Sequence, residues 1–495
     1  MKKYISIIGV LAFFKILIQC IGNRNYGFQR DELLHLSAAE HMDWGFIEFP
    51  PLIAGVAKIA ITFFGISLPG VRLFSTLAGV AILILCCLMA KALGGKNKAI
   101  LLSGIFTLAF IPFYRNHTLL QPVVFDQLFW TLGFYILIRF INSENKKLLL
   151  LLGISTGLGL LTKYTIAVWI FGVLLGLLWY KKAAIYKNLW FYMSIVLTLL
   201  LFLPNLIWQL KHDIPFLKHF KALKEQQLDS LSPFDFLLGQ FESPFTFCMV
   251  VIGLFFFFVD GSLKKYKPLG IAVSFIFITL WIVRAKVYYV FPVYPLLFAS
   301  AAVKIEEKFQ ENPVWIYTIG AITFLPSIFF IPMGTPILPI DTYVAYRGLQ
   351  KKNGRIQLTS DYADMFGWEE QVRALHSAYT SLSGEEQEAC LIWASNYGEA
   401  GAAEILGKKY KLPQAISKSG SFWLWGPGAI DTKVWIVIGY NKQDVENVFE
   451  EIELVSVLTN TYAVEEENHV PIYVCRSPKV AIPKLWSSWE DSVFE

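Results

Sequence analysis

Long apolar runs recur along most of the chain, and short polar segments separate them. A helix rises about 1.5 Å per residue, so runs of this length are typical of helices that cross a hydrocarbon core of roughly 30 Å. We therefore expect about eleven transmembrane helices. The expected spans are 4–22, 70–93, 97–114, 123–141, 148–162, 164–180, 188–208, 244–260, 267–283, 287–303 and 313–332. Only Lys163 and Tyr164 separate two of these runs, which form either a tight hairpin or one long bent helix.

The first apolar run begins after Lys2 and Lys3, as a signal peptide does. Lys15 interrupts this run, however, and no cleavage site made of small residues follows it. Because many further spans come after it, we expect an uncleaved first helix.

Basic residues gather in alternate loops between the spans, where the positive-inside rule predicts the cytoplasmic side. These basic positions are Lys91, Lys96, Lys98, Arg139, Lys146, Lys147, Lys181, Lys182, Lys187, Lys264, Lys265, Lys267, Lys304 and Lys308. The pattern predicts a multi-pass protein of the inner or plasma membrane, with a cytoplasmic N-terminus and the C-terminal tail outside. Two outer loops are long, 23–69 and 209–243. The first contains amphipathic stretches near 31–44 and 51–66, which we expect to lie as short helices on the membrane surface.

The tail, residues 334–495, alternates strand-like and helix-like segments, which predicts a soluble α/β domain after a transmembrane domain of residues 1–333. The expected strands are 391–395, 434–438 and 471–474, and the expected helices are 398–410 and 442–450. Cys390 and Cys475 both lie in the tail, so a disulfide between them is one alternative; free thiols are the other.

The composition agrees with a membrane protein. Hydrophobic residues make up 55% of the chain and charged residues only 16%, whereas soluble domains carry about 25% charged residues. The net charge is +5, and the basic residues lie mostly in short loops. This distribution argues against a nucleic-acid partner and in favour of membrane lipids.

Three acidic residues are candidates for chemistry at the outer membrane boundary. Asp31 and Glu32 follow the first span, and Asp126 begins another span on the same side. Acidic residues also favour helix starts, so a purely structural role is the alternative. A carboxylate at this boundary is able to take the proton of an acceptor hydroxyl.

Cations on the same side are candidates for binding an anionic lipid headgroup. Lys163 interrupts the apolar region at 148–180, and Arg284 and Lys286 precede Tyr288. Positive groups beside a phosphate stabilise charge that develops on it. Glu48 and His219, from two outer loops, are a candidate pair for a divalent metal ion, and the sequence predicts no other cofactor. It contains neither a GxxxxGK[ST] loop nor a GxGxxG after a strand, so a nucleotide donor is not expected.

Taken in order, several segments resemble GT-C glycosyltransferases, and most closely the branch of protein O-mannosyltransferases and aminoarabinose transferases. The segments are Asp31-Glu32, Phe49-Pro50-Pro51-Leu52, Arg72 after a Pro-Gly turn, Asp126, Gly159-Leu160-Leu161-Thr162-Lys163, Leu203-Pro204-Asn205, Lys286-Val287-Tyr288-Tyr289, Gly367-Trp368, Asn396-Tyr397-Gly398 and Trp423-Leu424-Trp425-Gly426-Pro427. The resemblance extends over most of the chain.

The resemblance implies transfer of a sugar from a polyprenyl-phosphate donor to a hydroxyl of a protein, lipid or glycan acceptor, on the non-cytoplasmic face of the cell envelope. Asp31 matches the catalytic carboxylate of the first outer loop, and Asp126 matches a second acidic position. Glu48 lies where the aminoarabinose branch has a glutamate, but Phe49 replaces the lysine that follows there. His219 resembles a histidine of that branch.

Two other functions remain as alternatives. A transporter or flippase of polyprenyl-linked glycans would also need a basic cavity that faces lipid, but it would place charges at the middle of the membrane and show repeated halves. A non-catalytic scaffold would use the tail to bind a partner. We expect an inverting glycosyltransferase with Asp31 as the general base, supported by Glu32.

Overall fold

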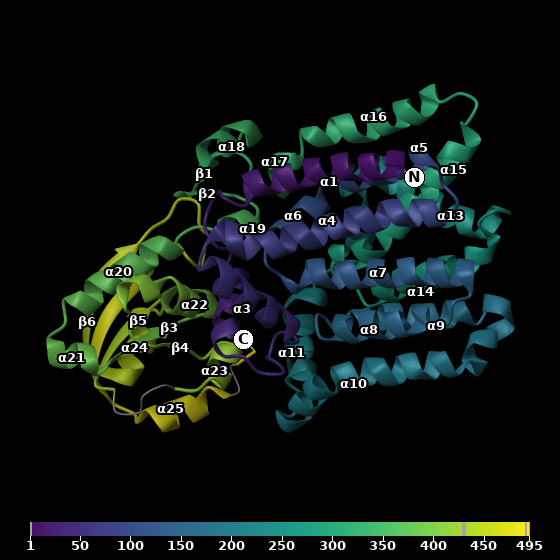
Figure 1. Ribbon diagram of the computed structural model, residues 1–495. Coiled ribbons are helices and arrows are strands. Elements are labelled where there is room, and N and C mark those ends of the chain that lie inside the picture. Colours follow the sequence, from purple (N-terminus) through teal and green to yellow (C-terminus); the bar gives the residue numbers. More distant parts are fainter. Residues whose placement is uncertain (1, 428–431, 491–492, 495) are drawn as a thin grey trace.

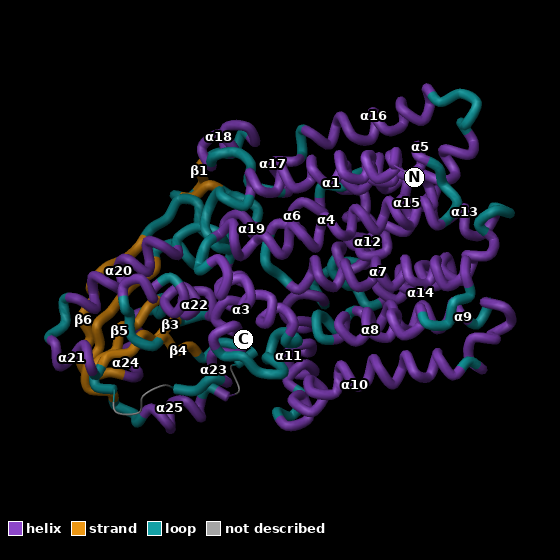
Figure 2. Tube along the Cα trace, viewed as in Figure 1, coloured by secondary structure: helices purple, strands orange, loops and turns teal. Residues whose placement is uncertain are grey.

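The computed structural model describes residues 2–427, 432–490 and 493–494. Helices of residues 2–334 form an elongated bundle, and a small sheet with its own helices lies at one end of it (Figure 1). Figure 2 shows that the strands are confined to the C-terminal part of the chain. The expected fold class, a polytopic α-helical protein with a C-terminal α/β domain, is confirmed. The boundary between residues 333 and 334 stays a prediction.

The bundle and its loops contain α1 (Lys2–Gly22), α2 (Arg30–Glu40), α3 (Leu52–Phe64), α4 (Leu68–Ala92), α5 (Asn97–Ala109), α6 (Pro112–Thr118), α7 (Pro122–Ser143), α8 (Leu148–Leu160), α9 (Ile166–Leu177), α10 (Leu189–Lys211), α11 (Pro215–Leu223), α12 (Pro233–Gly239), α13 (Pro244–Val259), α14 (Lys267–Ile282), α15 (Tyr294–Lys308), α16 (Val314–Ile328) and α17 (Ile331–Gly334). The C-terminal part contains α18 (Ile340–Arg347), β1 (Lys351–Lys352), β2 (Arg355–Ile356), α19 (Ser360–Ala363), α20 (Trp368–Thr380), α21 (Gly384–Glu388), β3 (Cys390–Ala394), α22 (Tyr397–Ile405), β4 (Ala415–Ser417), α23 (Ser421–Leu424), β5 (Val434–Ile438), α24 (Lys442–Val448), β6 (Phe449–Leu458), β7 (Val470–Pro478) and α25 (Ile482–Ser488).

Every predicted span falls on helical segments of the described chain. Among the described residues, six helices are long and apolar enough to cross a membrane, or up to eight if each of two bent pairs forms one span. One bent pair is α5 with α6, at 74°, and the other joins residues 233–242 to α13 at 108°. The helices α8, α9 and α16 are apolar but shorter.

The uncertain run at 148–180 consists of two helices, α8 and α9, with Lys163 in the turn between them. They pack against different neighbours: α8 against α7 and α10, and α9 against α14. Residues at the end of α7 and residues just after α9 line one common cleft, so the chain returns to the side from which α8 starts. The hairpin is therefore the correct alternative.

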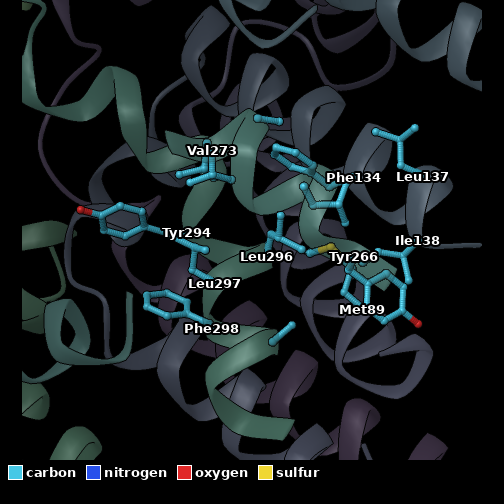
Figure 3. Close-up of a cluster of buried hydrophobic side chains, with 14 of the residues drawn as sticks. Met89, Phe134, Leu137, Ile138, Tyr266, Val273, Tyr294, Leu296, Leu297 and Phe298 are labelled. Atoms are coloured by element: carbon cyan, nitrogen blue, oxygen red, sulfur yellow. The ribbon is translucent and has the colours of Figure 1, made fainter. Parts of the chain in front are cut away.

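The centre of the bundle is filled by apolar side chains of α4, α7, α14 and α15, such as Met89, Phe134 and Leu297 (Figure 3). Small residues let the helix backbones approach one another, as is usual where lipid supplies no hydrophobic drive between helices. A Cβ atom at Gly253 of α13 would lie 2.1 Å from the carbonyl oxygen of Leu297 in α15.

The main sheet of the α/β domain has the strand order β4-β3-β5-β7-β6. The strands β4, β3 and β5 are parallel, and β7 runs antiparallel to β5 and β6. The three predicted strands correspond to β3, β5 and β7, while β4 and β6 were not predicted. Cys390 and Cys475 are free thiols, because β5 separates their strands.

The first amphipathic stretch, near 31–44, does not lie on a membrane surface as expected. Its helix α2 is buried from Glu32 to Ala39, because it packs between the bundle and α22 of the α/β domain. A Cβ atom at Gly401 of α22 would lie 3.0 Å from the Cβ of Leu33. In contrast, α3 keeps exposed apolar residues such as Phe63, which is 76% exposed.

A fully buried ion pair fixes the start of α2 on the bundle. Arg72 of α4 donates from Nη2 to Glu32 at 2.8 Å and from Nε at 3.0 Å, and both side chains are 0% exposed. Glu32 also accepts from the backbone N–H of Gln29 and of Leu120, both at 2.9 Å. The Gln29 bond is half of a capping box, so Glu32 performs the helix-start role that the sequence left open.

A second charged network joins α2 to the α/β domain. Arg30 forms ion pairs with Asp364 at 3.4 Å, Glu466 at 2.9 Å and Glu467 at 3.2 Å. Behind them lies Glu399, 1% exposed, which accepts from the N–H and the hydroxyl of Ser395. Burial and the charge of Glu467 hold the pKa of Glu399 well above its usual range.

The Arg72→Met variant should be strongly destabilised, by about 3–5 kcal/mol, because it leaves the buried Glu32 carboxylate without its cation. Thermal unfolding of the purified protein in detergent measures this as a lower midpoint. Arg139→Met, which changes an exposed arginine of α7, is the control and should melt like the wild type. Equal midpoints for the two variants would contradict the role of the pair.

The α/β domain should lose stability as pH rises from about 5 through neutral. In the unfolded chain Glu399 ionises near its ordinary value of 4.5, whereas in the folded domain it keeps its proton to higher pH, so rising pH favours unfolding until the folded group also ionises. Unfolding midpoints at several pH values should show a smaller slope for Glu399→Gln. Glu370→Gln, an exposed position on α20, should keep the wild-type slope. An unchanged slope for Glu399→Gln would refute the assignment.

Candidate active site

Most of the sequence-predicted site residues meet at the end of the bundle that faces the α/β domain. Asp31 lies at the start of α2, Asp126 at the start of α7, Lys163 in the α8–α9 turn and Lys286 between α14 and α15. They come from four separate segments of the chain, and only the packing of the bundle brings them together.

The Asp31 carboxylate is half-buried and held from both sides. Its Oδ1 accepts from the hydroxyl of Tyr397 at 3.0 Å, and its Oδ2 accepts from the side-chain amide of Gln121 at 2.9 Å. Its backbone N–H donates to the capping side chain of Gln29 at 2.8 Å. Asp31 therefore has a fixed orientation while part of its surface remains accessible.

Glu32 differs from its neighbour. It is 0% exposed, and Arg72 and two backbone N–H groups occupy its oxygens. The pair Asp31-Glu32 is thus divided: Asp31 faces the site and Glu32 faces the core. Glu32 supports Asp31 only through the position of α2.

Asp126 is also buried, at 5% exposed. It accepts from the hydroxyl of Thr165 at 2.8 Å and from the indole N–H of Trp130 at 2.9 Å. Its charge acts on Lys163, whose Nζ lies 4.2 Å from the ring centroid of Tyr289. Asp126 therefore anchors the turn that carries Lys163, and lies behind that lysine.

Three cations and two tyrosines surround the region next to Asp31. The charges of Lys163, Arg115 and Asp31 all act on Lys286, and those of Glu242 and Asp31 act on Arg115. Tyr288 lies 5.2 Å from Lys163 Nζ, measured to its ring centroid. Arrangements of this kind bind the oxygens of phosphate groups.

The structure adds Arg115, Gln121 and Tyr397 to the predicted residues and sets Arg284 apart. Arg115 lies in α6, where it also forms an ion pair with Asp361 of the α/β domain. Arg284 is exposed, and its guanidinium donates to the carbonyl oxygen of Asp229 at 3.4 Å. A charge next to the apolar run 97–114 was the only sequence signal for Arg115.

The metal pair of Glu48 and His219 stays a prediction, and the structure gives each of these residues other neighbours. Glu48 accepts from the N–H of Ser421 at 2.8 Å and from its hydroxyl at 2.5 Å, so it fastens the α/β domain to the loop before α3. Burial raises the pKa of Glu48. Burial and the nearby charge of Lys286 lower the pKa of His219. Among the described residues, no group of three or more His, Cys, Asp or Glu side chains is placed to hold a metal ion.

One family model and several solved structures are similar to this chain. Residues 48–208, about a third of the chain, match the family model described as dolichyl-phosphate-mannose-protein mannosyltransferase. No curated protein sequence matches the chain.

Solved structures of similar architecture include ArnT from Cupriavidus metallidurans in the apo state, with a TM-score of 0.64 at 11% identity. The same protein bound to undecaprenyl phosphate gives 0.61 at 11% identity, and each comparison covers 95% of this chain and 97% of the other. The Archaeoglobus fulgidus oligosaccharyltransferase, in complex with Zn and sulfate, gives 0.51 at 9% identity and covers 88% of this chain and 68% of its own. Together with the family match, this shared architecture confirms the resemblance seen in the sequence: the chain has the fold of the GT-C glycosyltransferases.

Proposed function

We propose that this protein transfers a sugar from a polyprenyl-phosphate donor to an acceptor hydroxyl on the non-cytoplasmic face of the membrane, with Asp31 as the general base. One observation carries the proposal: an oriented, half-buried carboxylate acts on Arg115 and Lys286 at the end of an apolar helix bundle, and Lys286 also lies within the influence of Lys163. A base and an anion-binding cluster are the two groups that this reaction requires.

The reaction is a single displacement. The acceptor hydroxyl gives its proton to the Asp31 carboxylate while its oxygen attacks the anomeric carbon of the donor. The bond between that carbon and the phosphate oxygen breaks, and polyprenyl phosphate leaves with the bonding electron pair. Attack opposite the leaving group inverts the configuration at the anomeric carbon.

The cation cluster supplies the second requirement. Negative charge grows on the phosphate oxygen as the bond breaks, and fixed positive groups lower the free energy of that transition state. The amino group of Lys163 lies over the rings of Tyr288 and Tyr289, and the charge of Asp126 acts on it. Because the cluster lies at the ends of membrane-spanning helices, a donor could bind there while its hydrocarbon chain stays in the bilayer.

The comparisons support the class of donor. The matched family model is described by dolichyl-phosphate-mannose, and ArnT has been crystallised with undecaprenyl phosphate. The acceptor is a glycan, lipid or protein hydroxyl. The basic loops favour the inner or plasma membrane, with the N-terminus in the cytoplasm and the site on the opposite face.

One observation favours the alternative of a transporter for polyprenyl-linked glycans. Lys15 in α1 is 0% exposed, and its Nζ lies 4.3 Å from the ring centroid of Tyr114, so a charged residue is buried within a span. Such residues often mark transport pathways. Arg115, Lys163 and Lys286, however, gather at the end of the bundle that carries Asp31, as a transferase requires.

Asp31→Asn should lower the transfer rate by about 1,000-fold, since an amide cannot take up the acceptor proton. Purified protein incubated with a panel of polyprenyl-phosphate sugars, with release of the lipid phosphate as the readout, measures this. Binding of the donor and the unfolding midpoint should be retained. Full activity in this variant would show that Asp31 is not the base, and no turnover of any donor by the wild type would favour the transporter.

Lys163→Met should lower kcat by about 100-fold, because it removes one fixed positive group from the leaving phosphate. The same lipid-release assay measures the change. Lys211→Met, an exposed lysine in the last turn of α10, is the matched control and should retain wild-type kcat. Equal rates for the two variants would contradict a phosphate-binding role for Lys163.

A further inference from the structure

The carboxyl end of strand β3 in the α/β domain lies next to the candidate site, because Tyr397, shortly after β3, donates to Asp31. In open sheets with parallel strands, ligands bind outside the carboxyl ends of the strands, where connections leave in opposite directions. Here β3 lies between two parallel neighbours, β4 and β5. The residues that directly follow β3, Ser395 to Tyr397, lie at this edge and extend toward α2 of the bundle.

Tyr397 is held rigidly at this edge. It is the first residue of α22, and Asn396 caps the helix by accepting from the N–H groups of Gly398 at 2.8 Å and Glu399 at 3.1 Å. The amide of Asn396 also donates to Glu467 at 3.0 Å. The backbone before Tyr397 is therefore fixed to the same network that binds Arg30.

Close packing of α22 on α2 sets the distance between Tyr397 and Asp31. A Cβ atom at Gly398 would lie 2.8 Å from Cγ of Arg30, and one at Gly401 would lie 3.0 Å from Cβ of Leu33. The absence of side chains at these two positions allows the helices to touch. A larger residue at either position would require α2 side chains or the helices themselves to shift.

The two donors to Asp31 come from different parts of the molecule. Tyr397, from the α/β domain, binds Oδ1, and Gln121, from the loop before α7, binds Oδ2. Two hydrogen bonds to the two oxygens fix the plane of a carboxylate. Burial and the charge of Asp31 raise the pKa of Tyr397, so its hydroxyl remains a donor.

Other charged and titratable groups face this hydrogen bond from all sides. Arg30 and Asp364 act on Tyr397. Asp31 also acts on Asp364, on His35 of its own helix, and on Glu48, Arg115 of α6 and Lys286.

We propose that Tyr397 is a positioning residue, through which the C-terminal α/β domain orients the Asp31 carboxylate for proton transfer. This inference rests on the proposed function of Asp31. The α/β domain then completes the active site, since without it Gln121 alone would hold the carboxylate.

The test compares Tyr397→Phe with Tyr462→Phe in the full-length protein. Each variant removes one hydroxyl that donates to an aspartate, because Tyr462 donates to Asp341 at 2.6 Å, away from the site. We expect Tyr397→Phe to lower kcat about tenfold, as is usual for a lost hydrogen bond to a charged group, with an unchanged KM for the donor. The acidic limb of the pH–rate profile should move to higher pH, because a carboxylate that loses a donor binds its proton more tightly. Tyr462→Phe should change none of these values.

A second substitution keeps the ring and the hydroxyl of Tyr397 and changes only how strongly that hydroxyl donates its hydrogen bond. Replacing Tyr397 by 3-fluorotyrosine makes the phenol more acidic and a stronger donor, so the acidic limb should move to lower pH. If Tyr397→Phe also lowers the unfolding midpoint, the pH–rate profile of the 3-fluorotyrosine protein decides the test. An acidic limb that does not move with 3-fluorotyrosine would overturn the proposal.

The outcomes separate the two proposals. If Asp31→Asn is inactive and Tyr397→Phe behaves like Tyr462→Phe, the positioning role is refuted and the proposed function stands. If Asp31→Asn keeps full activity, the base assignment fails, and the positioning role fails with it. If the double variant Asp31→Asn/Tyr397→Phe is no slower than Asp31→Asn, Tyr397 acts through Asp31 as proposed.

Discussion

The buried pair of Arg72 and Glu32 is the constraint on which the site depends. It joins α4 to the start of α2, and Glu32 also holds the N–H of Leu120, so one carboxylate fixes three segments of the bundle. A buried ion pair is costly unless its remaining lone pairs are satisfied, and here backbone donors satisfy them. Because the segment at Leu120 also carries Gln121, this arrangement places the Gln121 amide beside Asp31.

Three consecutive residues at the start of α2 perform three different tasks. Arg30 binds carboxylates of the α/β domain, Asp31 faces the candidate site, and Glu32 faces the core of the bundle. A helix turns by about 100° per residue, so neighbouring side chains point in different directions. One helical turn therefore connects both parts of the protein and presents the proposed base between them. The α/β domain contributes directly to the candidate site, because Tyr397 donates to Asp31 and Asp361 forms an ion pair with Arg115.

The sequence predicts the apolar helical segments and three of the strands well, because long apolar runs and β-branched runs are local signals. It also marks Asp31 and Lys163 as candidate site residues, because their charges stand out at the edges of apolar runs. The sequence wrongly predicts that α2 lies on the membrane surface. A helix buried between two parts of the chain has the same pattern of polar and apolar residues as a helix on a membrane surface. The sequence misses Tyr397, which lies 366 positions from Asp31, because such a contact depends on the packing of α22 against α2. The N-cap asparagine just after a strand is the one local signal that marks that edge.

The cation cluster implies a difference between binding the donor and binding the product. In the proposed reaction the donor is a phosphodiester with one negative charge, and the departing lipid phosphate gains a second as the glycosidic bond breaks. Lys163 and Arg115 both repel Lys286, and added negative charge relieves this repulsion, so the cluster interacts more strongly with the transition state than with the donor. The same interaction persists in the product. A cluster that accelerates the chemistry in this way should therefore hold the released lipid phosphate more tightly than the donor.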